Sequence, residues 1–156
     1  MINPDDPAGS IREISRYEIY FDVREQHYTR HNDQIHLLPA PWIYFWAGHI
    51  SVSRKHLLEV GMFDESYDGK WGVEDNDLGF RLHQAGVRIY LLREAQCIHY
   101  PHNTHKPEKE RQGRENCSFF YSKFPTVETG IFLKHYGEDA FVDINILCMQ
   151  AANRIS

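Results

Sequence analysis

Hydrophobic residues recur along the chain at two spacings, which predict its helices and strands. Between residues 74 and 86 the apolar positions fall on one face of a helix, and Gly86 ends it. Residues 87–91 alternate as a half-buried strand does, and residues 42–46 form a second run rich in strand-forming side chains. We therefore expect an α/β fold whose strands belong to a mixed sheet with flanking helices.

Capping residues and prolines mark the other elements. Ser53 is an N-cap for a helix that ends at Gly61, and Ser10 begins a capping-box spacing that predicts an earlier helix. Polar residues predict loops at 27–34 and 100–112. The sequence also predicts a helical C-terminus, with helices near 113–123, 127–136 and 139–152.

Length and charge narrow the class of protein. The chain has 156 residues, enough for one domain with a hydrophobic core. A formal charge of −5 argues against a nucleic-acid binder, and no run is long and apolar enough to predict a membrane span. The N-terminus has no secretory signal pattern, and three widely spaced cysteines favour a reduced, cytoplasmic location.

The segment 71–77, Trp-Gly-Val-Glu-Asp-Asn-Asp, places three carboxylates beside a glycine turn and a tryptophan. A sugar hydroxyl is a weak nucleophile, so a carboxylate within hydrogen-bond reach is a useful base. Asp75 at a helix N-terminus would be kept ionised by the helix dipole. Glu74, Asp75 and Asp77 are too close in sequence to share one face, so at most two can point into one pocket. Acids in a first turn can also serve only as caps, but the tryptophan, the glycine and the motif at 63–65 favour a catalytic site.

Several motifs occur in a fixed order around this segment. They are Ala47-Gly48, Gly61-x-Phe63-Asp64-Glu65, Trp71-Gly72-x-Glu74-Asp75 and Leu78-Gly79-x-Arg81-Leu82-x-x-x-Gly86. Over residues 42–102 this order closely resembles the C-terminal half of GT-A glycosyltransferases, in particular the galactosyltransferase-like C-terminal domain and family 2 enzymes.

The resemblance implies roles for the two acids that begin the helix. Asp75 corresponds to the general base that takes the proton of the acceptor hydroxyl, and Glu74 would orient acceptor hydroxyls. Related retaining enzymes that transfer N-acetylgalactosamine to peptides carry Glu-Asn at this place. Asp75 therefore favours an inverting, single-displacement transfer from a nucleotide-sugar donor to a glycan or other hydroxyl acceptor.

The resemblance also implies substrate and metal contacts. Trp71 would stack on a sugar ring beside the turn at Gly72, and Ala47 and Gly48 would line the donor sugar, with Trp46 next to them. His99 stands where these enzymes place a histidine that binds the catalytic Mn²⁺ or Mg²⁺. A rival zinc site from His99, His102 and His105 would need a helix, and Pro101 and Pro107 argue against one.

The donor-binding half of such an enzyme is not recognisable in this sequence. About forty residues precede Trp42, and they contain no strand that leads into Asp-x-Asp. The chain can be a fragment, a half completed by a second chain or a missing N-terminal domain, or a non-catalytic glycan-binding or regulatory module. We expect the isolated chain to be inactive, and we expect a homodimer through an exposed sheet edge or the C-terminal helices.

The sequence accordingly divides into three parts. Residues 1–41 form a lead-in and helix, residues 42–112 form the acceptor-side catalytic subdomain, and residues 113–156 form a C-terminal helical extension.

Overall fold

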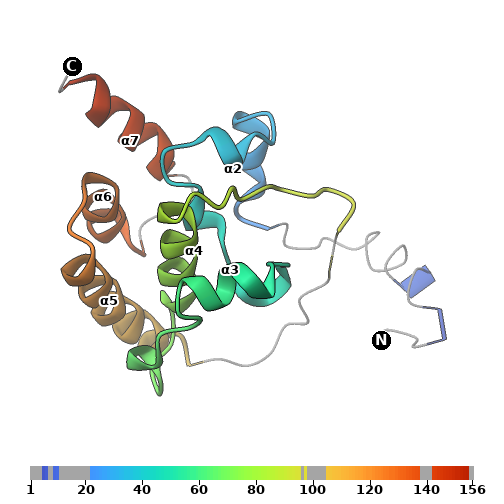
Figure 1. The fold of residues 1–156 in the computed structure, drawn as a ribbon, viewed down its shortest axis with the longest axis horizontal. Coiled ribbons are helices and arrows are strands. Elements are labelled where there is room, and N and C mark those ends of the chain that lie inside the picture. The colour runs from blue at the N-terminus through green and yellow to red at the C-terminus, as the bar shows by residue number, and fades with distance from the viewer. Residues whose placement is uncertain are drawn as a thin grey trace.

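The computed structural model describes residues 5–6, 9–10, 22–95, 97, 105–137 and 142–154. In this part of the chain α4 lies in the middle, with α5 and α6 on one side and α3 on the other (Figure 1). The α-helices are α2 (Glu25–Arg30), α3 (Arg54–Glu59), α4 (Glu74–Gln84), α5 (Lys106–Lys123), α6 (Val127–His135) and α7 (Ile144–Asn153). Short 3₁₀ helices connect them: η1 (Ile35–Leu37), η2 (Pro41–Tyr44), η3 (Ala47–His49) and η4 (Glu65–Tyr67).

Trp42 of η2 is the centre of the core. Its side chain is fully buried, and the rings of Phe80, Phe120 and Phe132 meet it edge-on at centroid distances of 5.5, 5.4 and 5.2 Å. Edge-to-face ring pairs stabilise a core beyond the area they bury. The tryptophan therefore joins η2 to α4, α5 and α6.

The packing of α4 against η2 positions the segment on which the candidate site depends. Asn76 donates through Nδ2 to the carbonyl oxygens of Trp42 and Ile43, at 3.2 and 3.3 Å. One turn further on, a Cβ at Gly79 would lie 2.7 Å from Cβ of Phe45, so only glycine allows this approach. The N-terminal half of α4 is thus fixed against the run that precedes Trp46.

A cluster of hydrogen bonds around Asp143 holds α7 to α2. The buried Asp143 caps α7 by accepting from the amides of Asn145 and Ile146, at 3.1 and 3.3 Å. Its Oδ2 lies 2.9 Å from Nε2 of His31 and 3.2 Å from Nδ1 of His27. Burial alone would raise the pKa of Asp143, but the hydrogen bonds to the two histidines outweigh it and hold the pKa below its usual value.

The predicted mixed sheet, and with it the α/β GT-A fold, is wrong for this structure, because the described residues contain no strand. Pro41 occupies the first turn of η2, and the run predicted as strand 42–46 closes into a 3₁₀ turn in which Phe45 N–H donates to Trp42 O at 3.1 Å. Residues 87–91 keep their alternation, with Ile89 and Leu91 packed on the core. They have no neighbouring strand among the described residues, and a strand needs one.

The predicted helices agree with the structure more closely than the predicted strands do. The structure confirms the helices predicted at 53–60 and 74–86, here α3 and α4, and it has three helices toward the C-terminus. The loop predicted over 100–112 is wrong from Lys106 onward, because Pro107 lies in the first turn of α5, where its missing N–H costs no hydrogen bond. The loop predicted at 27–34 is partly helical in α2, and most of the helix predicted from Ser10 lies outside the described residues.

None of the helices described by the structure has both the length and the apolar composition needed to cross a bilayer.

Candidate active site

A strained turn begins α4 and sets the direction of its first two side chains. Gly72 has a φ of +92° and Val73 a φ of +77°, so two successive residues adopt the left-handed conformation. For a β-branched residue this conformation costs about 1–3 kcal/mol and persists only where the surroundings impose it. Burial of the Val73 side chain, which is 4 % exposed, helps to offset that cost.

Asp75 is brought against the predicted donor-sugar segment. Its Oδ2 accepts a hydrogen bond from the backbone N–H of Ala47 at 2.9 Å, although the two residues stand 28 positions apart. Burial raises the pKa of the Asp75 carboxyl above its usual value, and the bond from Ala47 opposes this in part. No cation pairs with Asp75 within the described part of the chain.

Glu74 likewise has no cation partner among the described residues. Its Oε2 is buried and accepts no hydrogen bond from any described residue. Burial, and next to it the negative charge of Asp75, raise the pKa of Glu74 against the effect of nearby backbone N–H groups. A buried acceptor without a donor is costly in a folded protein, so it calls for a physical explanation.

The loop of Trp71 and Gly72 is held from outside by α5. Gln112 Oε1 accepts from Trp71 N–H at 2.9 Å, and Asn116 donates through Nδ2 to Gly72 O at 2.8 Å. Trp71 remains 46 % exposed, and Nζ of Lys109 lies 5.0 Å from the centroid of its ring. Helix α5 therefore fixes the backbone of the loop and leaves one ring available to solvent.

Trp46, Ala47 and Gly48 are exposed beside Asp75. The guanidinium carbon of Arg24 lies 4.1 Å from the Trp46 ring centroid and orders that ring by a cation–π contact. An added Cβ at Gly48 would meet nothing within 4 Å. The space over Gly48 is open, and no described neighbour requires a glycine there.

Asp77 faces the other way and is fully buried. Its Oδ1 accepts from Nε of Arg81 at 2.6 Å, and its Oδ2 accepts from Tyr67 Oη at 3.1 Å and from Nζ of Lys123. Lys123 also reaches Oδ2 of Asp64 at 2.6 Å. We call Asp64, Tyr67, Asp77, Arg81 and Lys123 the Asp77 network.

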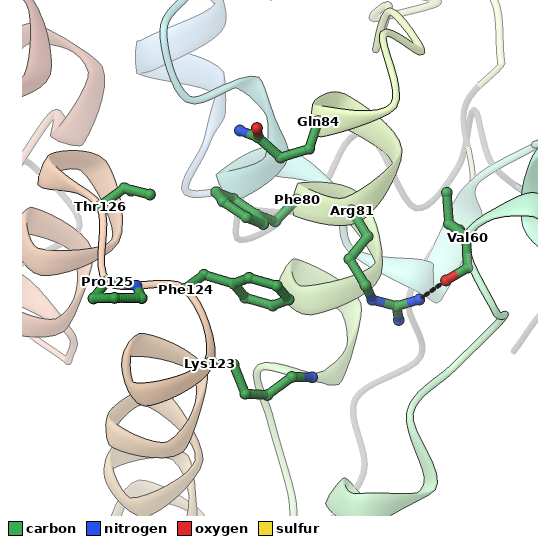
Figure 2. Close-up of a pocket in the computed structure, with 8 residues that line it drawn as sticks. All are labelled: Val60, Phe80, Arg81, Gln84, Lys123, Phe124, Pro125 and Thr126. Carbon is green, nitrogen blue, oxygen red and sulfur yellow. Dashed lines mark hydrogen bonds between the residues drawn. The ribbon is translucent and has the colours of Figure 1, made fainter.

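A hollow of about 500 Å³ borders the Asp77 network. Figure 2 shows Lys123 and Phe124 reaching from the end of α5 toward α4, which contributes Phe80, Arg81 and Gln84. Arg81 is bonded to the carbonyl oxygen of Val60 as well as to Asp77. Both cations at this hollow already have carboxylate partners, so it offers little uncompensated charge to a ligand.

The predicted metal ligand His99 lies outside the described residues, as does His102. In the described ranges no cluster of three or more histidine, cysteine or acidic side chains is arranged to hold a metal ion.

Sequence reasoning placed Glu74, Asp75, Trp71 and Ala47 in one site, and the structure brings Asp75 and Ala47 into contact. The sequence did not predict the residues that support the site. The spacing of Asp77 and Arg81, four apart on a helix, was a readable signal for an ion pair. Lys123, Gln112 and Asn116 lie more than 40 residues from their partners and leave no local signal.

Comparison with known proteins identifies the family. The family described as "N-terminal domain of galactosyltransferase" matches residues 26–106, just over half of the chain. No solved structure matches the chain.

Three relatives illustrate the similarity. Validoxylamine A glucosyltransferase of Streptomyces hygroscopicus subsp. jinggangensis is 29% identical over 126 residues, which cover 81% of this chain and 30% of that protein. The uncharacterized glycosyltransferase YfnE of Bacillus subtilis is 37% identical over 83 residues, 53% of this chain and 21% of that protein. Chondroitin synthase of Pasteurella multocida is 27% identical over 150 residues, 90% of this chain and 15% of that protein. The chain thus spans less than a third of the length of these relatives.

These matches confirm the prediction of a glycosyltransferase domain, whereas the assignment to a C-terminal half and to family 2 stays a prediction. With a match over residues 26–106 that includes the turn and helix of Glu74 and Asp75, the chain belongs to the galactosyltransferase family.

Proposed function

We propose that this chain forms the acceptor side of a glycosyltransferase site in which Asp75 is the general base. The observation that carries the proposal is the state of the Asp75 carboxylate. It is half-buried, oriented by Ala47 N–H and not neutralised by a cation among the described residues. These properties suit a base that must be pointed at a substrate hydroxyl and remain free to take its proton.

The proposed step is a single displacement. The acceptor hydroxyl gives its proton to Asp75 through Oδ1, the oxygen that Ala47 does not occupy. The acceptor oxygen forms a bond to the anomeric carbon of the donor while the bond from that carbon to the diphosphate oxygen breaks. One displacement inverts the anomeric configuration, in agreement with the Glu-Asp pair at residues 74 and 75.

Neighbouring residues would hold the substrates for this step. Glu74 would orient acceptor hydroxyls, the role that its pairing with Asp75 implies. The exposed Trp71 ring stacks on a sugar face. Trp46, Ala47 and Gly48 face the donor sugar across Asp75.

We propose that the donor nucleotide is bound by a region outside this chain. The named activities of the relatives belong to proteins of which the match to this chain covers 30% and 15%. We propose that a donor-binding region, in the same polypeptide or in a second chain, completes the site together with His99 and Mn²⁺ or Mg²⁺. UDP-sugars and Mn²⁺ titrated into the isolated chain should show no tight binding, and tight metal-dependent nucleotide binding would contradict this division.

Homodimer formation stays a prediction. A dimer through a sheet edge is no longer proposed, because the described residues contain no sheet, and the C-terminal helices are the other predicted interface.

Replacement of Asp75 tests the proposal in the smallest assembly that transfers sugar. Asp75→Asn keeps the hydrogen bond from Ala47 but cannot take the proton, so we expect kcat to fall about 10²- to 10⁴-fold. Glu94→Gln, which removes an exposed carboxylate from the turn after residue 92, is the matched control and should leave kcat unchanged. Retained turnover in Asp75→Asn would remove Asp75 from the base role. Glycan binding without turnover in any assembly would instead favour a non-catalytic glycan-binding module.

A further inference from the structure

A pocket of about 240 Å³ lies on the side of Glu74, next to the proposed base. Its walls come from the loop between Phe63 and Lys70 and from the first residue of α4. Asp75 is not part of its lining. The site therefore has two neighbouring parts, with Asp75 turned to Ala47 and Glu74 turned to this loop pocket.

The loop pocket carries uncompensated negative charge. Asp64 is neutralised by Lys123, and Nζ of Lys70 lies 3.4 Å from Oε2 of Glu115, a carboxylate that also pairs with Arg111. Asp68 and Glu74, by contrast, form no ion pair with any described residue. The lining thus holds two carboxylates without an ion pair and one ammonium group, that of Lys70, so carboxylates outnumber cations there.

The rest of the lining suits a sugar ring. Phe63 is 46 % exposed and supplies an apolar wall on which the C–H face of a ring can pack. Gly69, with a φ of +76°, would have no atom within 4 Å of an added Cβ, so the pocket is open there. Carboxylates only accept hydrogen bonds when ionised, and hydroxyl or ammonium groups are the donors that match them.

We propose that the loop pocket is a subsite for the sugar or polyol unit that bears the acceptor hydroxyl, and that it selects neutral or amine-bearing units over anionic ones. The assignment of this subsite to the acceptor rests on the proposed function, whereas its selection by charge rests on the pocket alone. An ammonium group gains attraction from Asp68 and Glu74, a neutral ring gains hydrogen bonds and the contact with Phe63, and a carboxylate or phosphate is repelled.

Protein-observed NMR on the isolated chain tests the charge selection without any donor or turnover. The probes are the methyl glycosides of glucosamine, glucose and glucuronic acid. We expect amide shifts at Phe63, Gly69 and Glu74, with the amine binding on the order of three- to tenfold more tightly than the neutral glycoside. The glucuronide should not reach saturation. Equal or tighter binding of the glucuronide, or shifts confined to residues outside 63–74, would overturn the proposal.

Charge-removing variants locate the effect. Asp68→Asn and Glu74→Gln should each bring the affinity for the amine toward that of the neutral glycoside, and Glu94→Gln should leave it unchanged. If neither Asp68→Asn nor Glu74→Gln alters the preference, the proposal is wrong.

Asp75→Asn separates this inference from the proposed function. It should keep the order of the three glycosides, because Asp75 does not line the pocket. Charge-selective binding in this variant together with retained turnover would overturn only the base role of Asp75. Lost turnover without charge-selective binding in any form of the chain would overturn only the subsite.

Discussion

Asp75 and Asp77 stand two residues apart on α4, and their surroundings are opposite. Asp75 has one backbone N–H as its partner and a raised pKa, whereas Asp77 is fully buried among a guanidinium, an ammonium and a phenol. Helical geometry turns side chains at i and i+2 to different sides of the axis. One acidic segment can therefore present a reactive face and a structural face at once.

The two faces differ in what holds them. The reactive face depends on a turn with two left-handed residues and on backbone contacts from α5, while the structural face depends on ion pairs in a low-exposure setting. A buried charge that loses its partners is strongly destabilising. Replacement of a carboxylate that has few partners should change the free energy of unfolding little. Substitutions on the two faces should therefore differ in how far they lower the free energy of unfolding.

Removal of Lys123 should have a large effect on the structural face. Lys123→Met leaves Asp77 with Arg81 and Tyr67 only, and should lower the free energy of unfolding by about 3 kcal/mol, near the lower end for a broken buried pair. Urea unfolding measures it. Lys55→Met, which removes a cation from an exposed pair with Glu59 at 3.8 Å, is the control and should change stability by less than about 0.5 kcal/mol. Equal effects of the two changes would mean that the Asp77 network does not stabilise the fold.

The sequence predicted one of these faces better than the other. The helix beginning at Glu74 and the site role of Asp75 rest on local signals, namely helical spacing, a glycine turn and a motif order. The partners of Asp77 could not be read in the same way, because Lys123 lies 46 residues away and meets Asp77 only when α5 packs on α4.

The strand prediction at 42–46 was wrong for a related reason. Its side chains are strand formers, but Pro41 and burial of the run favour a 3₁₀ turn around Trp42. Strand propensity describes a fit to neighbouring strands, and the described residues supply none. Local composition was therefore a poor guide where tertiary packing decides.

A change at Gly72, on the reactive face, should lower the free energy of unfolding by less than Lys123→Met does. Gly72→Ala places a Cβ at a φ of +92° and 3.2 Å from Oη of Tyr136. We expect a loss of about 1–2 kcal/mol in the free energy of unfolding.

Gly130→Ala is the matched control for that change. Gly130 lies within α6, where an added Cβ would meet Cε2 of Tyr121 at an ordinary 3.4 Å. Alanine should be neutral there or stabilising by up to about 1 kcal/mol. Similar losses in both variants would show that the turn at Gly72 imposes no special conformation.

The smallest expected effect is in the titration of Glu74. Because its pKa is raised in the folded chain by burial and by the charge of Asp75, the folded state binds the proton more readily than the unfolded state does. Stability should accordingly fall as the pH rises from 4.5 through the folded pKa of Glu74, and Glu74→Gln should remove that fall.

NMR titration of the side-chain carboxyl gives the pKa of Glu74 directly. The midpoint should lie above 4.5 and move down in Asp75→Asn, which removes the neighbouring charge. A midpoint at or below 4.5 would show that Glu74 is solvated like an ordinary surface carboxylate.

The most direct test of the division between the two faces is the free energy of unfolding of Asp75→Asn and Asp77→Asn, measured side by side in urea. Asp77→Asn should lose about 3–5 kcal/mol, because it leaves Arg81 and Lys123 without their buried anion. Asp75→Asn should stay within about 0.5 kcal/mol of the parent chain or exceed it, since the amide oxygen can still accept from Ala47 N–H and no buried charge remains. A loss in Asp75→Asn as large as that in Asp77→Asn would contradict the account and place Asp75 among the structural residues.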